Sequence, residues 1–300
     1  MKSKHIALLI VVAGVWGGNF AVIQYGLEHV PPLALSAMRF FMAAFPACLL
    51  FPRPKVSLRR ILTIGMTLGA LMSGFQFAGM SFGVGVATSS VVLQSQSVFT
   101  TLMAVVLLGE RPSRLMWSST LIGVMGLACF WWNFKDSTVF IGFLMVVIAA
   151  FWWAVGNLII KNTPVVNTVA LMAWMSLVPI IPLGGLSFFF EGSPIETLLA
   201  VTNLKSLIAA LYLGLGVMIF GYGVWSRMLQ KYDASQVVPY SLLVPVFGVI
   251  FGVVFFDESV STLQLIGAIF LVLAAALNSF QIRNISSVNE ITKNHTRSEN

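Results

Sequence analysis

Charge is scarce in this 300-residue chain. Asp, Glu, Lys and Arg together make up 9% of the residues, whereas a soluble domain carries about 25%. Apolar residues make up 58%, before the 25 glycines are counted. A folded soluble protein of this size still leaves about a quarter of its chain's surface in water, so it could not hide this much apolar surface. The composition excludes a soluble globular domain and predicts an all-α polytopic membrane protein.

The residues that catalysis and metal binding require are also few. The three histidines, His5, His29 and His295, lie outside the apolar runs or at their edges, and no His-Glu-x-x-His motif occurs. The two cysteines, Cys48 and Cys129, lack metal-ligand spacing and are expected to be small buried hydrophobes. A Gly-x-x-x-x-Gly-Lys-Ser/Thr phosphate loop is absent. The sequence therefore argues against an enzyme or an ATP-driven pump, and we expect no metal and no cofactor.

Lys and Arg outnumber Asp and Glu by 17 to 10, which gives a net charge of +7. Binding to nucleic acid requires basic residues gathered on one face, whereas here they lie in short stretches between apolar blocks. We therefore expect no nucleic-acid partner. The expected partners are the lipid bilayer and a small-molecule substrate.

Uncharged runs divide the chain at the length of transmembrane helices, which need about 20 apolar residues to cross a hydrocarbon core of about 30 Å. The run 61–109 is long enough for two helices, and the turn-forming stretch 83–88 divides it. The first run begins like a signal peptide but has no cleavage site before Gly26, so we expect it to be retained. Ten spans are predicted, near residues 6–26, 32–51, 61–81, 88–108, 115–132, 139–160, 168–190, 206–228, 236–256 and 262–280.

The distribution of Lys and Arg predicts the orientation. With a cytoplasmic N-terminus, 14 of the 17 Lys and Arg residues lie on the cytoplasmic side. Only Lys135 and Lys205 lie outside, and Arg39 lies within the membrane. Ten spans place both termini in the cytoplasm, and residues 283–300 are predicted to form a disordered cytoplasmic tail.

The chain carries an internal repeat. A shift of 148 residues aligns 92–124 with 240–272 and gives eight identities, among them Glu110 with Glu258. The earlier spans correspond at an offset near 137. Each half, 1–134 and 135–282, contains five predicted spans, and this odd number inverts the second half relative to the first. Two inverted five-helix repeats around a shared pathway favour a transporter.

Several stretches resemble the EamA family of the drug/metabolite transporter superfamily. They are Val15-Trp16-Gly17-Gly18-Asn19-Phe20, Met38-Arg39-Phe40, Leu108-Gly109-Glu110-Arg111 and Leu263-Gln264-Leu265-Ile266-Gly267. The likeness extends over about residues 5–280. It implies ten spans, a place in the bacterial inner membrane, export of small metabolites and no catalysed reaction.

Polar and aromatic side chains inside the predicted spans are the candidate substrate-binding residues, because polar groups in hydrocarbon face a cavity or another helix. Those of the first half lie outward of the membrane centre and those of the second half inward, so we interpret them as outer and inner gates around one central site. Trp16 and Trp153 would also suit ordinary helix packing, and only one of Gln94 and Gln96 is expected to line the cavity. Pro245 frees a backbone carbonyl that offers an acceptor to an ammonium group. The candidates are Trp16, Asn19, Arg39, Gln76, Gln94, Gln96, Trp153, Asn157, Tyr222, Tyr240 and Pro245.

Arg39 is the most informative of these residues. The sequence places no Asp or Glu within any predicted span. Either the guanidinium extends to the membrane surface, or it is buried and pairs with carbonyls, amides or the carboxylate of a substrate.

The first functional hypothesis is a secondary exporter of small zwitterionic metabolites, such as cysteine and O-acetylserine, that works by alternating access. The alternatives are an exporter of other small solutes, such as purines, drugs or sugar derivatives, and, less favoured, a channel or an intramembrane enzyme. Energy coupling by facilitated diffusion, proton linkage or antiport stays open, and so does a homodimer.

The predicted topology can be tested with two single cysteines, after Cys48 and Cys129 are replaced by alanine. A cysteine at Ser259 is expected to react with an impermeant reagent added outside intact cells, because this position follows the ninth span on the outer side. A cysteine at Ser113, between the fourth and fifth predicted spans on the cytoplasmic side, is expected to stay unlabelled. The reverse labelling would contradict the orientation.

Overall fold

The computed structural model describes residues 1–108, 114–133, 137–164, 166–232 and 234–277, and the regular elements of this part of the chain are all helices. The predicted tail and Glu110 lie outside the described residues.

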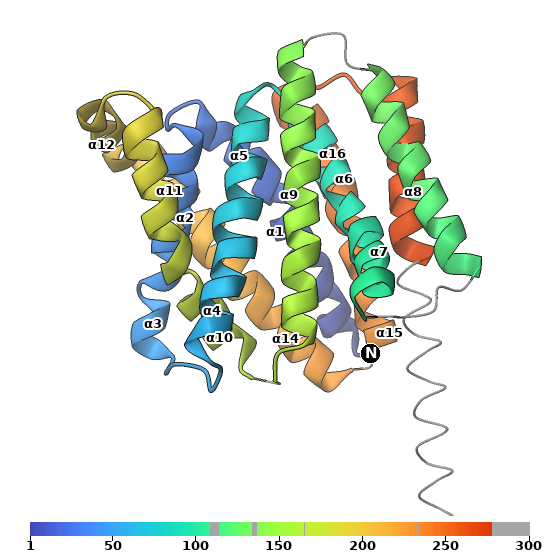
Figure 1. Ribbon diagram of the computed structural model, residues 1–300, viewed down its shortest axis with the longest axis horizontal. Coiled ribbons are helices and arrows are strands. Elements are labelled where there is room, and N and C mark those ends of the chain that lie inside the picture. Colours follow the sequence, from blue (N-terminus) through green and yellow to red (C-terminus); the bar gives the residue numbers. More distant parts are fainter. Residues whose placement is uncertain (109–113, 134–136, 165, 233, 278–300) are drawn as a thin grey trace, which may run out of the picture.

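The helices stand side by side in a bundle (Figure 1). They are α1 Ser3–Leu27, α2 Pro32–Ala44, α3 Ala47–Leu50, α4 Leu58–Ile64, η1 Gly65–Ser73, α5 Gly74–Ser81, α6 Val86–Val92, η2 Leu93–Ser95, α7 Gln96–Leu108, α8 Arg114–Asn133, α9 Ser137–Lys161, α10 Thr168–Met175, α11 Leu177–Phe190, α12 Pro194–Thr202, α13 Leu204–Leu211, η3 Tyr212–Gly221, α14 Tyr222–Lys231, α15 Ala234–Val237, η4 Val238–Leu242 and α16 Leu243–Phe256, followed by a last helix, Thr262–Leu277.

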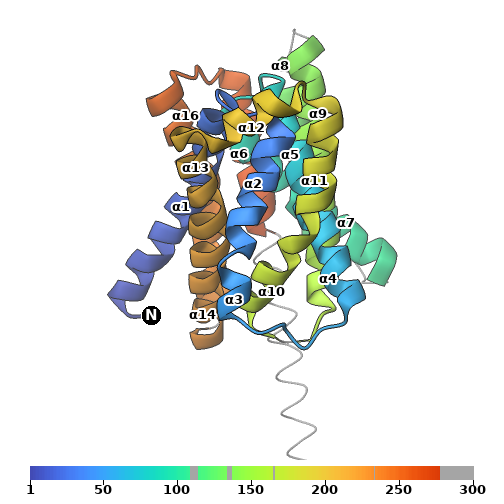
Figure 2. The ribbon, with the colours of Figure 1, turned by 90° about the vertical axis from the view of Figure 1, so that its left-hand side faces the viewer.

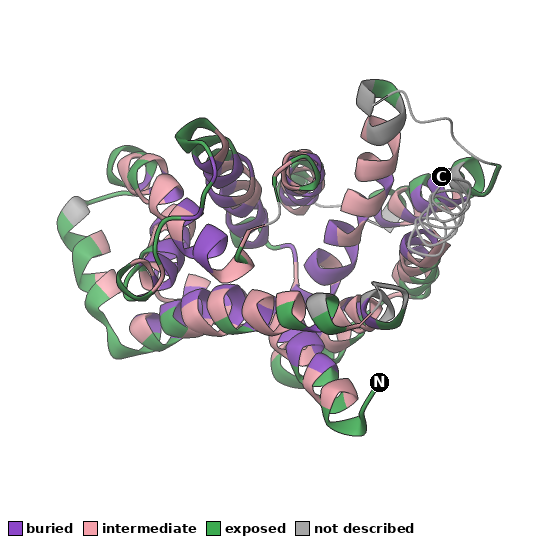
Figure 3. Ribbon diagram, turned by 90° about the horizontal axis from the view of Figure 1, so that it is seen from below, coloured by how far each residue is buried: buried purple, intermediate pink, exposed green. Residues whose placement is uncertain are grey.

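The bundle is that of a multi-pass membrane protein. Among the described residues, six helices are long and apolar enough to cross a membrane, namely Ser3–Leu27, Pro32–Leu50, Leu58–Ser81, Ser137–Lys161, Thr168–Phe190 and Leu204–Leu229. Three shorter apolar helices are Trp117–Trp132, Tyr240–Phe256 and Thr262–Leu277. Large apolar side chains such as Leu49, Ile181 and Phe190 are exposed on the outside, which suits lipid rather than water. Buried residues face the inside of the bundle (Figure 3).

A helix lies in each of the ten ranges predicted from the sequence, with three differences. The seventh range is interrupted at Ser176, between α10 and α11. The second range is interrupted between α2 and α3, where Phe45 and Pro46 are not helical, because proline removes a backbone donor. The short helix α12 is not among the predicted elements. It has nine residues, too few to cross a membrane, and it lies at one end of the bundle with Ile195 and Leu199 exposed (Figure 1).

The two halves share the same irregular helices in the same order. A π-helical segment, η1, lies inside the third predicted span, and a second one, η3, begins 147 residues later. The short 3-10 helices η2 and η4 follow in the corresponding places, at 93–95 and 238–242. The offset agrees with the shift that aligns the two halves in the sequence.

The corresponding segments run in opposite directions. In Figures 1 and 2, α4 lies at the lower end of the bundle and α5 at the upper end, whereas α13 lies above α14. The third and eighth predicted spans therefore cross the bundle in opposite senses.

Glycine allows α1 and α16 to pack closely between the two halves. A Cβ atom added at Gly17 would contact the side chain of Phe247 and lie 2.9 Å from the carbonyl oxygen of Val244. Helices in a membrane gain stability from close backbone approach, because lipid provides no hydrophobic force between them. Gly17 therefore brings the first half against the second beside Trp16.

Replacing this glycine should destabilise the bundle. Gly17→Ala is expected to lower the free energy of unfolding by about 1–3 kcal/mol, because the added methyl group must push α1 away from α16. Gly184→Ala in α11 is the matched control, since a Cβ atom added there would have nothing within 4 Å, and it should be neutral or slightly stabilising. Thermal unfolding of the purified protein in detergent measures both. Equal stability of the two variants would contradict the packing argument.

Candidate substrate-binding cavity

A cavity of about 260 Å³ lies inside the bundle, between the two halves. Its walls include α1 and α2 from the first half and α9, η3 and α14 from the second half. Ligand pockets for drug-sized molecules span about 300–1,000 Å³. The volume therefore suits a small solute.

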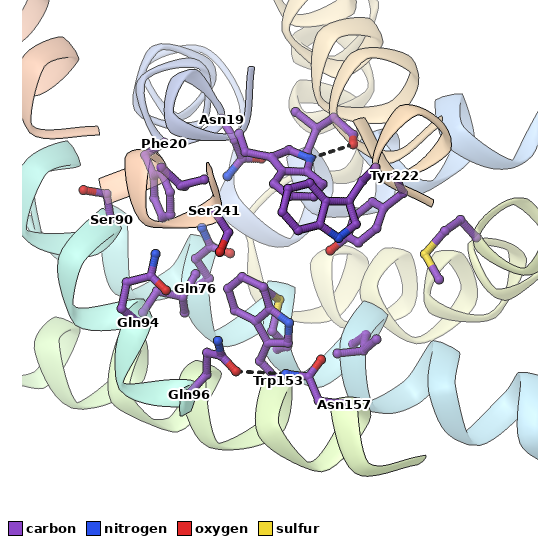
Figure 4. Close-up of a pocket in the computed structure, with 18 of the residues that line it drawn as sticks. Asn19, Phe20, Gln76, Ser90, Gln94, Gln96, Trp153, Asn157, Tyr222 and Ser241 are labelled. Atoms are coloured by element: carbon purple, nitrogen blue, oxygen red, sulfur yellow. Dashed lines mark hydrogen bonds between the residues drawn. The ribbon is translucent and has the colours of Figure 1, made fainter. Parts of the chain in front are cut away.

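Nine of the eleven candidate residues line this cavity, several of them labelled in Figure 4. They are Trp16, Asn19, Arg39, Gln76, Gln94, Gln96, Trp153, Asn157 and Tyr222. Tyr240 and Pro245 do not line it; Ser241 and Val244 from the same segment do. The reason is the 3-10 helix η4, which has three residues per turn instead of 3.6 and so changes which side chains point inward. Tyr240 packs instead on a small apolar cluster with Leu9, Met228 and Val237.

The cavity brings together side chains that the sequence analysis assigns to two separate gates, one outer and one inner. The Trp16 ring lies 5.1 Å from that of Tyr222 and 5.2 Å from that of Trp225, between ring centroids. Asn157 donates a hydrogen bond from Nδ2 to Oε1 of Gln96 over 2.8 Å (Figure 4). Residues of the predicted outer gate thus contact residues of the predicted inner gate within one site. Both Gln94 and Gln96 line the cavity, not one of them, since Gln94 lies within the 3-10 turn η2 and Gln96 directly follows it.

All four irregular segments border the cavity. Leu68 and Met72 belong to η1, Val217 to η3, Gln94 to η2 and Ser241 to η4. Departures from α-helical geometry often mark functional sites. Here they surround one space from both halves.

The Trp16 side chain is fixed by the second half. Its indole Nε1 donates to the carbonyl oxygen of Val217 over 3.2 Å. One residue before Trp16, the carbonyl of Val15 accepts a hydrogen bond from the Tyr212 hydroxyl over 2.9 Å. The ring packs over Gly221, where a Cβ atom would collide with the indole. The tryptophan therefore forms a positioned wall of the cavity.

Arg39 is buried within the bundle and does not reach the membrane surface. Its side chain is 5% exposed, and its guanidinium lies 5.5 and 5.8 Å from the ring centroids of Phe40 and Phe77. Its Nη2 atom lies 3.3 Å from Sδ of Met218, a weak acceptor. The buried Nε and Nη1 atoms have no hydrogen-bond partner. An incompletely paired charge in this environment is costly.

Two further lining residues carry buried polar atoms without a partner. They are the Oδ1 acceptor of Asn19 and the Nε2 donor of Gln76. Buried polar groups in native proteins are hydrogen-bonded in the great majority of cases, so each exception needs an explanation. The wall of the cavity thus offers donors from Arg39 and Gln76 and an acceptor from Asn19. No Asp or Glu is found among the described residues that line it.

Several lining residues give no signal in the sequence. Met72, Met172 and Val217 are apolar residues in apolar runs, and only the fold places them at the cavity. Trp225 and Ser90 are aromatic and polar residues of predicted spans, a visible signal, yet they are not among the eleven candidates.

Comparison with known proteins is consistent with a transport site. The model of the EamA-like transporter family matches the chain twice, over residues 3–132 and 140–280. The chain is 34% identical to a probable amino-acid metabolite efflux pump of Escherichia coli (strain K12) over 293 residues, which cover 94% of this chain and 96% of that protein. A protein of the same description from Salmonella typhimurium is 35% identical over 289 residues, with 94% and 96% covered.

The chain is also similar to a more distant relative and to a solved structure. An uncharacterized inner membrane transporter of Escherichia coli (strain K12), YedA, is 24% identical over 269 residues, which cover 88% of this chain and 86% of that protein. A solved crystal structure matches with a TM-score of 0.60 and 18% identity, and covers 95% of this chain and 99% of that chain. At this identity the likeness concerns the fold alone.

Removing the Arg39 charge should stabilise the protein. Arg39→Met replaces an incompletely paired buried cation by an apolar side chain, and it is expected to raise the free energy of unfolding by about 1–4 kcal/mol. Lys205→Met is the control, because Lys205 is exposed at the start of α13 and should change stability by less than about 0.5 kcal/mol. Thermal unfolding in detergent measures both. A strongly destabilised Arg39→Met variant would show that the guanidinium supports the fold rather than a ligand.

Proposed function

Because the chain belongs to the EamA-like transporter family, we propose that it exports small amino-acid-type metabolites, such as cysteine or O-acetylserine, across the bacterial inner membrane by alternating access. It is a transporter and not an enzyme. One observation carries the choice of substrate class. The unpartnered donors and acceptor of the cavity wall, on Arg39, Gln76 and Asn19, complement a zwitterion.

The carboxylate of the substrate would bind at Arg39. Two of the three guanidinium nitrogens, Nε and Nη1, have no partner in the protein. The third, Nη2, has only the weak sulfur acceptor of Met218, so either Nε or Nη1 can form a donor edge of the planar group together with Nη2. Such an edge matches the two oxygens of a carboxylate in a bidentate pair. The Nε2 group of Gln76, which also lacks a partner, would supply a third donor.

The ammonium group of the substrate would bind on the aromatic side of the same cavity. The Oδ1 atom of Asn19 is the free acceptor there, one turn along α1 from Trp16. Trp16, Tyr222 and Trp225 place three rings around this region. Aromatic faces attract cations without requiring a carboxylate, which suits a cavity whose described lining includes no acid.

We further propose the finer architecture: ten spans arranged as two inverted halves, 1–134 and 135–282, with both termini in the cytoplasm. The double match of the family model, the recurring order of irregular helices and the opposite courses of α4–α5 and α13–α14 support it. Since no Asp or Glu lies within the predicted spans, a dedicated proton relay is not favoured. Facilitated diffusion or antiport would be compatible with predicted spans that contain no acidic residue.

Other small solutes are the second candidate. A sugar phosphate would need several cations, and Arg39 is the one basic residue in the described cavity lining. The cavity volume of about 260 Å³ also disfavours large drugs. An amino-acid-sized zwitterion therefore fits best.

The proposal is tested by pairing variants with altered substrates in reconstituted vesicles, with labelled cysteine and O-acetylserine as the probes. Arg39→Gln is expected to lower the affinity for the intact amino acid about 10–150-fold, because a charge-assisted pair worth about 1.5–3 kcal/mol is lost. Arg39→Lys should also transport poorly, since it keeps the charge but loses the fork geometry. Saturable flux would distinguish a carrier from a channel.

The decisive comparison uses substrates with one blocked group. An ester of the carboxylate should be transported equally poorly by wild type and Arg39→Gln, whereas an N-acetyl derivative should remove the difference between wild type and Asn19→Leu. Lys205→Gln, outside the cavity, should behave as wild type. If Arg39→Gln loses intact and carboxylate-blocked substrates to the same extent, Arg39 does not bind the carboxylate.

A further inference from the structure

Two helices of the first half begin without a cap of their own. The N-cap residue of α2 is Pro31 and that of α6 is Gly85, and neither provides a side-chain hydrogen bond to the helix. The first N–H groups of a helix have no partner within the helix. Such groups need a partner elsewhere, either in another part of the protein or in water.

Carboxylates of the second half supply both missing caps. Glu191, directly after α11, accepts hydrogen bonds from the backbone N–H groups of Leu33 and Ala34, over 2.6 and 2.9 Å. Glu258, the second residue after α16, accepts them from Val86 and Ala87, over 2.5 and 2.8 Å. Each carboxylate therefore uses both oxygens on two successive N–H groups. Each also places a negative charge at the positive end of a helix.

The backbone around Glu258 is shaped for this contact. Asp257 adopts a left-handed conformation with φ of 51° and ends α16, so the chain turns back at the next residue. A Cβ atom at Gly85 would lie 2.5 Å from Oε1 of Glu258, and one at Gly252 would lie 2.7 Å from Oε2. Glycine on both sides thus leaves room for the carboxylate. Gln264 adds a contact from the last helix, from Nε2 to the Thr88 hydroxyl over 3.4 Å.

Both capped helices carry walls of the cavity. Arg39 lies on α2, and Ser90 and Gln94 lie on α6 and η2, between one and three turns from the capped ends. In the proposed topology the capped ends lie at the outer face of the membrane. A path from the cavity to the outside must therefore open between elements that these carboxylates tie together.

We propose that Glu191 and Glu258 are releasable latches that hold the outer side of the transporter closed and position α2 and α6 around the substrate. The proposal rests on the alternating access of the proposed function, but not on the identity of the substrate. Opening toward the outside breaks the two pairs of hydrogen bonds and lets water satisfy the freed N–H groups and carboxylates. Weakening a latch should therefore favour the outward-open state.

The test measures access to the cavity from outside, without substrate. In a background with Cys48→Ala and Cys129→Ala, a single cysteine replaces Ser90, which is buried and lines the cavity. An impermeant thiol reagent is added to intact cells, and the labelling rate is compared for Glu258→Gln, Glu258→Ala and Glu191→Gln. Glu196→Gln, an exposed acid in the first turn of α12, is the matched control.

In each latch variant, the introduced cysteine is expected to be labelled about fivefold faster than in the parent protein. This ratio corresponds to the roughly 1 kcal/mol that the loss of a helix cap typically costs. Glu258→Ala should exceed Glu258→Gln, because glutamine keeps one acceptor oxygen. The Glu196→Gln control should label at the parental rate. Thermal unfolding of the same purified proteins identifies a variant that labels merely because it is unfolded.

Unchanged labelling in both Glu258 variants, together with a lower unfolding temperature, would overturn the proposal and leave the carboxylates as static caps. Faster labelling in variants of a protein that moves no amino acid would uphold the latches and refute the proposed substrate. The two failures are therefore distinguishable.

Discussion

The constraint on which this structure depends is that hydrocarbon satisfies no hydrogen bond. Every polar atom inside the bundle must find a partner in the protein, in trapped water or in a ligand. Most buried hydroxyl groups meet this demand within their own helix, as Ser90 and Ser176 do by donating to carbonyls of the preceding turn. Arg39, Asn19 and Gln76 do not, and all three line one cavity. The wall of that cavity therefore offers unpaired hydrogen-bond donors and an unpaired acceptor to a ligand.

The same constraint explains how the halves depend on each other. Atoms that one half cannot satisfy are satisfied by the other: the Trp16 indole by Val217, the first N–H groups of α2 by Glu191 and those of α6 by Glu258. Neither half offers a complete set of partners by itself. These contacts between the halves lie at the cavity and at the predicted outer ends of the helices, where the proposed alternating access would require the halves to separate and meet again.

The sequence was sufficient to locate the helices and most of the polar and aromatic residues of the cavity wall. Long uncharged runs identify helices because a charge inside a bilayer is costly, and polar residues such as Arg39 and Gln76 stand out within them for the same reason. The sequence was insufficient where the lining of the cavity depends on the rotation of a helix, or where a contact joins residues that are far apart in the chain. The 3-10 turn η4 exchanges Tyr240 and Pro245 for Ser241 and Val244. Glu191 and Glu258 are separated from their backbone partners by more than 150 residues, although the capless starts at Pro31 and Gly85 were visible hints.

The irregular helices bear on two points: which residues line the cavity, and why the sequence did not identify all of them. A helix that stays regular presents one stripe of side chains to its neighbours, whereas a π or 3-10 segment shifts the stripe and alters which groups face inward. In both halves such segments interrupt the helices beside the cavity and not at their ends. Toward the predicted outer side, α5 packs closely on α9 through Gly79, and α16 packs closely on α6 through Gly252. The fold thus packs closely toward the predicted outer surface and departs from α-helical order beside the cavity, where the unpartnered atoms of Arg39, Asn19 and Gln76 lie. A substrate that binds there would contact walls from both halves, so it would stabilise the arrangement in which the two halves close around it.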